Sequence, residues 1–89
     1  MNKTEMAKEY LASVIAPLTK TPDRIQINSA IDQGGLGIML NVVATDNDLA
    51  FLIGKKGATA RCIRHLVKAW GDQHQARILL HIGNPIQIQ

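Results

Sequence analysis

The chain reads IGKKGATARCI over residues 53–63, where two glycines enclose two lysines between an apolar segment and an amphipathic pattern. Gly54 and Gly57 lack a Cβ, so the backbone can turn sharply there and an anion can approach it closely. Gly57 is predicted to open a helix, whose free N–H groups favour a negatively charged group. Because Lys55 and Lys56 add two positive charges to the same loop, this stretch is predicted to hold a phosphate backbone.

Helices are predicted on both sides of this loop. Thr45-Asp46 supplies an N-cap signal for a short helix over Asn47–Ile53 that ends at the first loop glycine. A longer helix is predicted over about 57–70, with Gly71 as its C-terminal stop. Its apolar positions recur at helical spacing, and they are Ala60, Ile63, Val67 and Trp70, with Cys62, Leu66 and Ala69 widening the stripe. The opposite face is mostly cationic and carries Arg61, Arg64, His65 and Lys68.

The remaining residues predict one more helix and three strands. Residues 3–16 show helical spacing of apolar side chains after a capping signal, and Pro17 marks the end of that helix. Alternating apolar and polar residues predict strands over about 25–32, 38–43 and 76–82. The middle strand carries apolar residues on both faces, including Met39 and Val43 on the second face, which indicates that it is the most buried.

Two connections are predicted from glycine-containing stretches. Gln33-Gly34-Gly35 is expected to join the first two strands as a hairpin. Gly83-Asn84-Pro85 is expected to form a turn, which leaves Ile86–Gln89 as a tail without an assigned role.

The resulting order, α-β-β-α-α-β, predicts an α+β fold in which three helices cover one face of a small three-stranded mixed sheet. The first two strands are expected to be antiparallel. The helix pair acts as a crossover that returns the last strand parallel to the second. The chain is interpreted as a single domain over residues 1–89, with a core of about 3–82 and a C-terminal tail over 83–89.

Composition narrows the class of protein. A hydrophobic fraction of 46% in 89 residues predicts a folded domain with a small core. The single cysteine, Cys62, excludes an intrachain disulfide and is expected to be inert on the apolar side of its helix. His65, His74 and His81 lack the paired spacing of a zinc site, so no metal or cofactor is expected. Neither a signal-peptide pattern nor a membrane-length apolar run is recognised, and a soluble cytoplasmic protein is expected.

The net charge of +3 conceals an asymmetry along the chain. Residues 1–48 carry four Lys or Arg and six Asp or Glu, a net charge of −2. Residues 49–89 carry six Lys or Arg and one Asp, a net charge of +5. A charge run is most often only a solvated helix face. Here the positive charge gathers on and just after the glycine loop, which favours a nucleic-acid partner.

The segment Asp48–Arg64, which reads DLAFLIGKKGATARCIR, resembles the G-x-x-G region of the KH domain in its bacterial, type II arrangement. The chain is similar to the small single-domain bacterial KH RNA-binding proteins (KhpA/YlqC-like), and the shared organisation extends over about residues 3–82. A lone G-x-x-G is a weak signal, but the preceding Ile53, the following Ala60 and Ile63 and the chain length make it specific. The chain departs from the family in Leu52-Ile53-Gly54, where Val-Ile-Gly is common, and in a longer tail.

The resemblance implies that the loop clamps the backbone of about four single-stranded nucleotides. It assigns the phosphate contacts to Gly54, Lys55, Lys56 and Gly57. Base contacts are expected from a groove beside the loop, and the groove or flanking residues are Ile53, Ala60, Arg61, Ile63 and Arg64. An aromatic fraction of 3% cannot build the stacking surface of an RRM or OB fold, whereas a KH groove relies on aliphatic contacts and hydrogen bonds.

At the level of biology, the resemblance implies a single-stranded RNA-binding protein that acts as an RNA chaperone or post-transcriptional regulator. It also implies a homodimer, or a heterodimer with a second KH-containing protein (KhpB/Jag type), as well as association with ribosomes and a role in cell shape. Membrane association is not expected.

Alternative functions are weighed against RNA binding. An enzyme is not expected, because G-x-x-x-x-G-K-[ST] is absent and the carboxylates are scattered. A protein-interaction module, used for dimerisation or ribosome docking with RNA binding secondary, is the main alternative. Single-stranded DNA binding is a third, because no residue in the sequence identifies a contact to a 2′-hydroxyl group. The preferred bases, the RNA targets and the dimer interface are not predicted.

Overall fold

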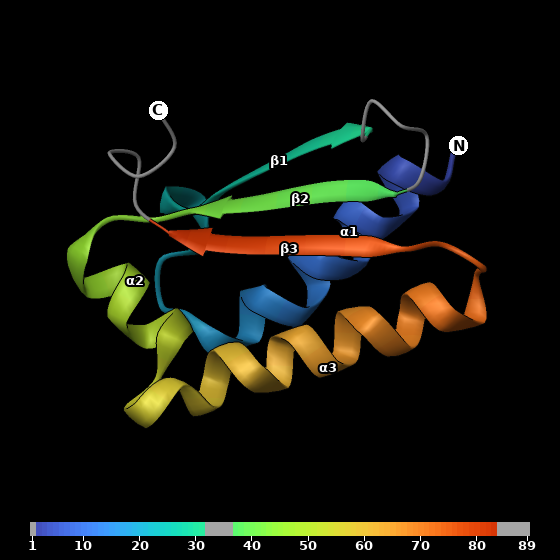
Figure 1. Cartoon of the computed structure of the whole chain (residues 1–89). Helices are drawn as coiled ribbons and strands as arrows, with labels where there is room; N and C mark the ends of the chain where they lie inside the picture. The colour runs from blue at the N-terminus through green and yellow to red at the C-terminus, as the bar shows by residue number, and fades with distance from the viewer. Residues whose placement is uncertain (1, 32–36, 84–89) are drawn as a thin grey trace.

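The computed structural model describes residues 2–31 and 37–83, and its helices lie on one face of a three-stranded sheet (Figure 1). The elements in chain order are α1 (Lys3–Ile15), η1 (Ala16–Leu18), η2 (Pro22–Arg24), β1 (Gln26–Ile31), β2 (Ile38–Val43), α2 (Asp46–Ile53), η3 (Lys55–Gly57), α3 (Ala58–Gln73) and β3 (Ile78–Gly83). Apart from the three single-turn 3₁₀ helices, this is the predicted α-β-β-α-α-β order. The α+β fold with a mixed sheet is confirmed.

The sheet has the strand order β1-β2-β3. β1 pairs with β2 in antiparallel fashion, with Ile31 opposite Ile38, and β2 pairs with β3 in parallel, with Ile38 beside Ile78. Both predicted pairings are therefore confirmed. The predicted Gln33–Gly35 connection lies outside the described residues.

β2 is the most buried strand because it has a strand on each side and helices over one face. Ile38, Leu40 and Val42 point into the core, and the latter two are fully buried. On the other face the prediction holds for Val43, which is 8% exposed, but not for Met39, which is 38% exposed. Both residues lie on the face of the sheet opposite the helices, which Figure 1 shows on one face only.

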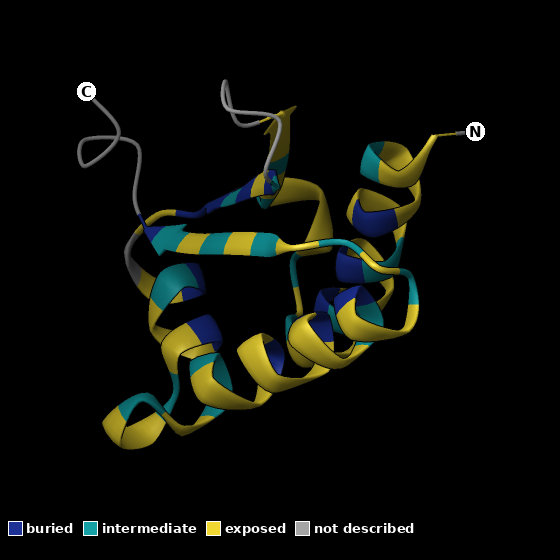
Figure 2. Ribbon diagram, turned by 45° about the vertical axis from the view of Figure 1, so that its right-hand side comes forward, coloured by how far each residue is buried: buried dark blue, intermediate teal, exposed yellow. Residues whose placement is uncertain are grey.

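The core lies between the sheet and the helices, and the buried stripe of each helix faces it (Figure 2). α1 begins at Lys3 because the Asn2 side chain accepts a hydrogen bond of 2.9 Å from the Glu5 N–H. Pro17 ends the α-helical turn as predicted, although the chain continues as a 3₁₀ turn through Leu18. The helical residues that are buried in the core are Ala7, Leu11, Ile15, Leu52, Ile63 and Val67.

The end of α3 differs from the prediction. Gly71 does not stop the helix, which continues to Gln73. A Cβ on Gly71 would lie 2.5 Å from the Ala76 carbonyl oxygen and 3.0 Å from Ile78 Cγ1. Gly71 therefore lies at a point of close contact, where the absence of a side chain lets the chain fold back against the helix and enter β3. The backbone carbonyl of Gly71 accepts a hydrogen bond of 2.8 Å from the Ala76 N–H.

The apolar stripe of α3 is narrower than predicted. Ile63, Val67 and Gly71 are its buried residues. The residues expected to widen it, Cys62, Leu66 and Ala69, are exposed instead. Cys62 and Leu66 each lie one residue before a buried position, and a step of one residue turns the side chain by about 100° around the helix.

Trp70, which belongs to the predicted apolar stripe, is a packing residue near the end of α3. Its ring stacks on His74 with a centroid distance of 4.0 Å and on Tyr10 of α1 with a centroid distance of 6.0 Å. The His74 ring also makes a 2.8 Å hydrogen bond to the Trp70 carbonyl. This cluster joins the end of α3 to the middle of α1 and leaves Trp70 half-buried.

β3 includes Gly83, which is predicted to lie in the turn and tail that follow the strand. Gly83 pairs with Val43, and its carbonyl accepts a hydrogen bond of 3.1 Å from the Ala44 N–H. The remainder of the predicted turn and the tail, residues 84–89, lie outside the described residues. Among the helices that the structure describes, none has the length and apolar character to cross a membrane.

We expect Gly71→Ala to lower the free energy of unfolding by about 1–3 kcal/mol, because the added methyl group overpacks the contact with Ala76 and Ile78. Helix propensity alone would favour alanine by about 1 kcal/mol. Urea denaturation followed by circular dichroism measures the balance, with Ala69→Gly calibrating propensity at an exposed position of the same helix. An increase in stability for Gly71→Ala would contradict the close approach.

Candidate nucleic-acid interface

The corner between α2 and α3 depends on Gly54. Its N–H donates a 2.9 Å hydrogen bond to the Ala50 carbonyl and closes α2. The chain then leaves the helix with φ 74° and ψ 176° at Gly54, a backbone region that is essentially restricted to glycine. A Cβ would also lie 2.7 Å from Thr59 Cβ and 2.9 Å from the Thr59 nitrogen. Both the backbone geometry and the space available therefore require glycine here.

The loop itself is a single left-handed turn. Lys56 and Gly57 both have positive φ, 55° and 76° respectively, and the Gly57 N–H donates a 3.2 Å hydrogen bond to the Gly54 carbonyl. For a residue with a Cβ such as Lys56, this conformation costs about 1–2 kcal/mol. Arg61 helps to hold it, because its Nη1 donates a 3.0 Å hydrogen bond to the Lys56 carbonyl. The loop thus presents a defined backbone shape.

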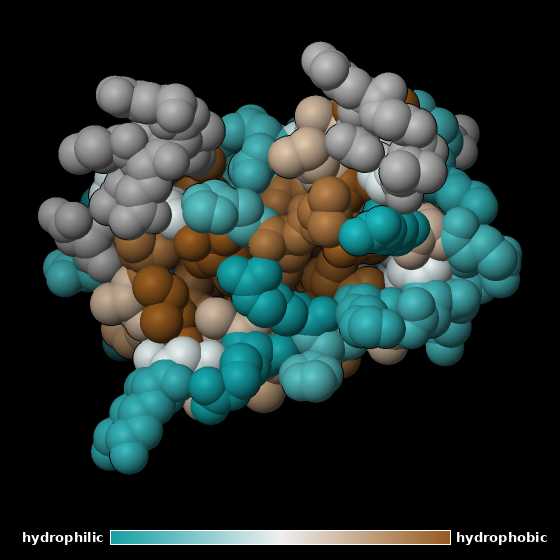
Figure 3. All heavy atoms as spheres, in the orientation of Figure 1, coloured by the Kyte–Doolittle hydropathy of each residue, from teal (hydrophilic) through white to brown (hydrophobic). Residues whose placement is uncertain are grey.

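The electrostatics of the loop favour an anion. Within the described part of the chain, no side chain caps the amino-terminal N–H groups of α3. These groups carry the positive end of the helix dipole. The side chains of Lys55 and Lys56 are exposed at the same point, and hydrophilic side chains project clear of the molecule there (Figure 3). The turn therefore combines N–H donors with two exposed positive charges, which suits a phosphate group.

The structure places the predicted clamp residues Gly54, Lys55, Lys56 and Gly57 together in this turn. The predicted apolar residues beside them divide into two groups. Ile53 is partly exposed and Ala60 half-buried beside the loop. Ile63 is 0% exposed and belongs to the core, so its placement does not support the predicted contact with a base.

Two arginines of α3, both predicted to flank the site, make specific contacts to backbone carbonyls. Arg61 reaches back to the loop, where it donates its hydrogen bond to the Lys56 carbonyl. Arg64 reaches across to the sheet, where its Nη1 donates a 2.6 Å hydrogen bond to the Leu80 carbonyl of β3. Arg61 therefore supports the loop, whereas Arg64 spans the space between α3 and β3.

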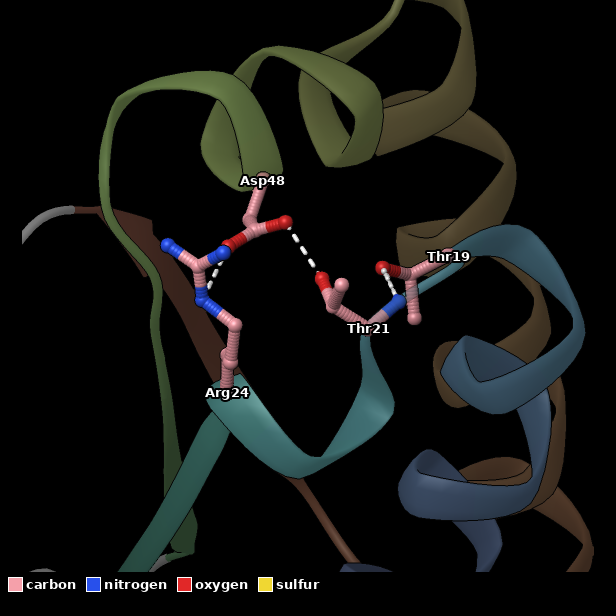
Figure 4. A network of polar contacts seen from close by, with 4 residues as sticks. All are labelled: Thr19, Thr21, Arg24 and Asp48. Atoms are coloured by element: carbon pink, nitrogen blue, oxygen red, sulfur yellow. Dashed lines mark hydrogen bonds and ion pairs between the residues drawn. The ribbon is translucent and has the colours of Figure 1, made fainter.

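A polar network behind α2 was not predicted from the sequence (Figure 4). Asp48 is the buried charged residue of the described core. Its Oδ1 accepts a 2.5 Å hydrogen bond from the Thr21 hydroxyl, and its Oδ2 lies 3.4 Å from Arg24 Nε. Thr19 adds a local contact, because its hydroxyl oxygen accepts a 3.2 Å hydrogen bond from the Thr21 N–H.

This network connects the segment between α1 and β1 to the first turn of α2, and α2 leads directly into the loop. The signal in the sequence was the spacing of Asp48 four residues before Leu52, which puts both on one helix face. Leu52 is fully buried, so a carboxylate on the same face needs a partner. The partners Thr21 and Arg24 lie 27 and 24 positions earlier, a separation that no local pattern reveals.

The element order and the loop between α2 and α3 define a KH domain in the type II arrangement. A solved structure supports this fold: "Crystal structure of Era in complex with MgGDPNP and nucleotides 1506-1542 of 16S ribosomal RNA" matches with a TM-score of 0.61 at 17% identity. The match covers 94% of this chain and 31% of the Era chain, so this protein spans about a third of that length. The family model "KhpA/KhpB, KH domain" matches residues 8–82, and the chain belongs to this family.

Curated relatives agree with this assignment. The RNA-binding protein KhpA of Listeria monocytogenes is 32% identical over 75 residues, which cover 84% of this chain and 96% of the relative. The RNA-binding protein KhpA of Chlamydia pneumoniae is 31% identical over 75 residues, with 84% and 94% coverage. That of Clostridium acetobutylicum is 28% identical over 75 residues, with 84% and 97% coverage. The family is one of RNA-binding proteins and not of enzymes.

The two loop glycines are expected to respond differently to substitution. Gly54→Ala meets Thr59 in addition to the unfavourable backbone angles, and should lower the free energy of unfolding by about 3 kcal/mol. Gly57→Ala is the matched control, because its Cβ would meet only Arg61 Nη1 at 3.6 Å, and it should cost about 1 kcal/mol. Chemical denaturation of the two variants side by side tests this order, and equal losses would contradict the tight junction at Gly54.

The Asp48 network is expected to stabilise the fold mainly through Thr21. Thr21→Val leaves a buried carboxylate oxygen without its donor and should cost about 1–3 kcal/mol of unfolding free energy. Arg24→Met should cost less than about 1 kcal/mol, because the Arg24 side chain is 66% exposed and its ion pair is screened by water. Thermal and urea denaturation measure both. A larger loss for Arg24→Met than for Thr21→Val would show that the ion pair dominates.

Proposed function

We propose that this protein binds single-stranded RNA and holds the RNA backbone with Gly54, Lys55, Lys56 and Gly57. The observation that carries the proposal is the shape of the turn. Two glycines with positive φ bring the uncapped amino terminus of α3 and two exposed lysines to one point of the surface. The names of the KhpA relatives and the ribosomal RNA in the Era structure's title are consistent with this partner.

In the proposed complex, the backbone N–H groups of the turn and the amino terminus of α3 donate hydrogen bonds to a phosphate group. Lys55 and Lys56 add attraction that is sensitive to salt. These contacts position the strand without reading its sequence. The partly exposed Ile53 and Ala60 beside the loop offer aliphatic contacts to the adjacent bases, and Arg61 keeps the turn in its left-handed shape.

A single small site of this kind binds weakly, so the protein is proposed to work in a multivalent assembly. Pairing with a second KH-containing chain, either another copy or a KhpB/Jag-type partner, would raise the effective concentration of binding sites on one RNA. An RNA chaperone or post-transcriptional regulator is the role that weak, sequence-tolerant and salt-sensitive contacts suit.

Charge reversal in the loop tests the clamp. We expect wild type to bind short single-stranded RNA weakly and more tightly at low salt, and Lys55→Asp/Lys56→Asp to lose binding while staying folded. The dependence of log K on log salt should also become shallower, by about 0.7 for each phosphate that the variant no longer neutralises. Fluorescence anisotropy with labelled RNA across a salt series gives both quantities.

Lys3→Asp/Lys8→Asp is the matched control, because it changes the net charge equally at exposed positions of α1. This control should retain binding apart from a general weakening at low salt. Equal binding by the wild type and the loop variant would overturn the clamp. A loop variant that no longer binds RNA but still self-assembles would separate the RNA site from a protein-interaction surface. A DNA strand of the same sequence tests selectivity for RNA.

A further inference from the structure

The face of the sheet that points away from the helices (Figure 1) carries an apolar row across all three strands. Ala30, Met39 and Leu79 lie beside one another in this row. All three are exposed, and the exposed fractions of Met39 and Leu79 are 38% and 42%. An apolar sheet face is normally buried against a second layer. The described residues therefore leave this face of the sheet incomplete.

Val43 lies on the same face but is buried. It is four residues beyond Met39 on β2, about 13 Å farther at about 3.3 Å per residue, and it is only 8% exposed. Val43 does not belong to the described core cluster between the sheet and the helices. Its neighbour on β3 is Gly83, which has no side chain to cover it, and its neighbour on β1, Gln26, is exposed. The burial of Val43 therefore points to a further covering group on this face.

The segment that follows β3 starts beside Val43. β3 ends at Gly83, which pairs with Val43 at a strand spacing of about 4.8 Å. Residues 84–89 read NPIQIQ, so Ile86 and Ile88 alternate with two glutamines. Alternate side chains of an extended segment point to the same side, which lets both isoleucines face the sheet while the glutamines face water. Six extended residues span up to about 20 Å, enough to reach the apolar row.

We propose that residues 84–89 fold back over the uncovered face of the sheet of their own chain and form its second layer. Ile86 packs on Val43, and Ile88 reaches toward Met39, whose flexible side chain adapts to the contact. Between the two contacts the backbone of the segment crosses a polar row, whose side chains can pair with its N–H and C=O groups. This polar row consists of Asn28, Asn41 and His81. The inference does not depend on RNA binding, and it closes an apolar surface that would otherwise be open to association with other chains.

Thiol labelling of the sheet face tests this contact. In a Cys62→Ser background, Met39→Cys places one thiol on the apolar row and Leu66→Cys places one on the exposed side of α3. We expect dithionitrobenzoate to react with the Met39→Cys thiol about tenfold more slowly in the full chain than in a chain truncated after Gly83, which corresponds to a segment docked in about nine of ten molecules. Leu66→Cys is the matched control and should react at the same rate in both chains.

Substitutions within the segment repeat the test at constant chain length. Ile86→Gln/Ile88→Gln should lower the melting temperature by about 5 °C and raise the labelling rate on the apolar row to that of the truncated chain. Gln87→Ala/Gln89→Ala, which changes the residues that face water, should leave both quantities unchanged. In a Val43→Ala background the isoleucine substitutions should cost less, because the contact that they remove is already weakened. Circular dichroism establishes that each variant is folded.

Three outcomes would overturn the proposal. The first is an equal labelling rate on the apolar row in the full chain and in the chain with both isoleucines replaced. The second is protection that increases with protein concentration, because the covering segment would then belong to a second copy. The third is an equal loss of stability from the isoleucine and the glutamine substitutions, since docking would then not depend on the apolar side of the segment. None of these outcomes bears on the RNA clamp, which is tested separately.

Discussion

The sharp corner at Gly54 is the constraint on which the candidate site depends. α2 can end and α3 can begin a few residues later only because Gly54 adopts a backbone conformation closed to other residues and lies against Thr59 without a side chain. The same corner brings the lysines and the start of α3 to a single point. Packing and recognition are therefore linked at this position, since one backbone geometry both joins the helices and shapes the proposed phosphate site.

The corner is held from two sides by different kinds of interaction. On the core side, Leu52 and Ile63 anchor the helices that flank the loop, and both are fully buried. On the polar side, Asp48 ties the start of α2 to the segment before β1 through Thr21 and Arg24. Hydrophobic contacts are non-directional, whereas hydrogen bonds have preferred geometry. The core therefore keeps the helices on the sheet, and the polar network helps to fix how α2 lies there.

Glycine has three different roles along α2 and α3. Gly54 is required both by its positive φ and by the lack of room for a Cβ. Gly57 is required mainly by its positive φ, and Gly71 only by the lack of room for a Cβ. The motif spacing identified the first two correctly as loop residues. The prediction of a helix stop at Gly71 was wrong, because a glycine late in a helical pattern is usually a stop signal and the strand that packs against it is visible only in three dimensions.

The sequence by itself determined the order of the elements, the strand pairing, the position of the glycine loop and the family, because these follow from local periodicity and a short motif. Tertiary structure alone decided what each side chain faces. It placed Cys62 on the surface, joined Asp48 to Thr21 across 27 residues, and set Arg64 against Leu80. The physical reason is that periodicity defines a helix face to within about one residue, whereas burial depends on neighbours that are distant in the chain.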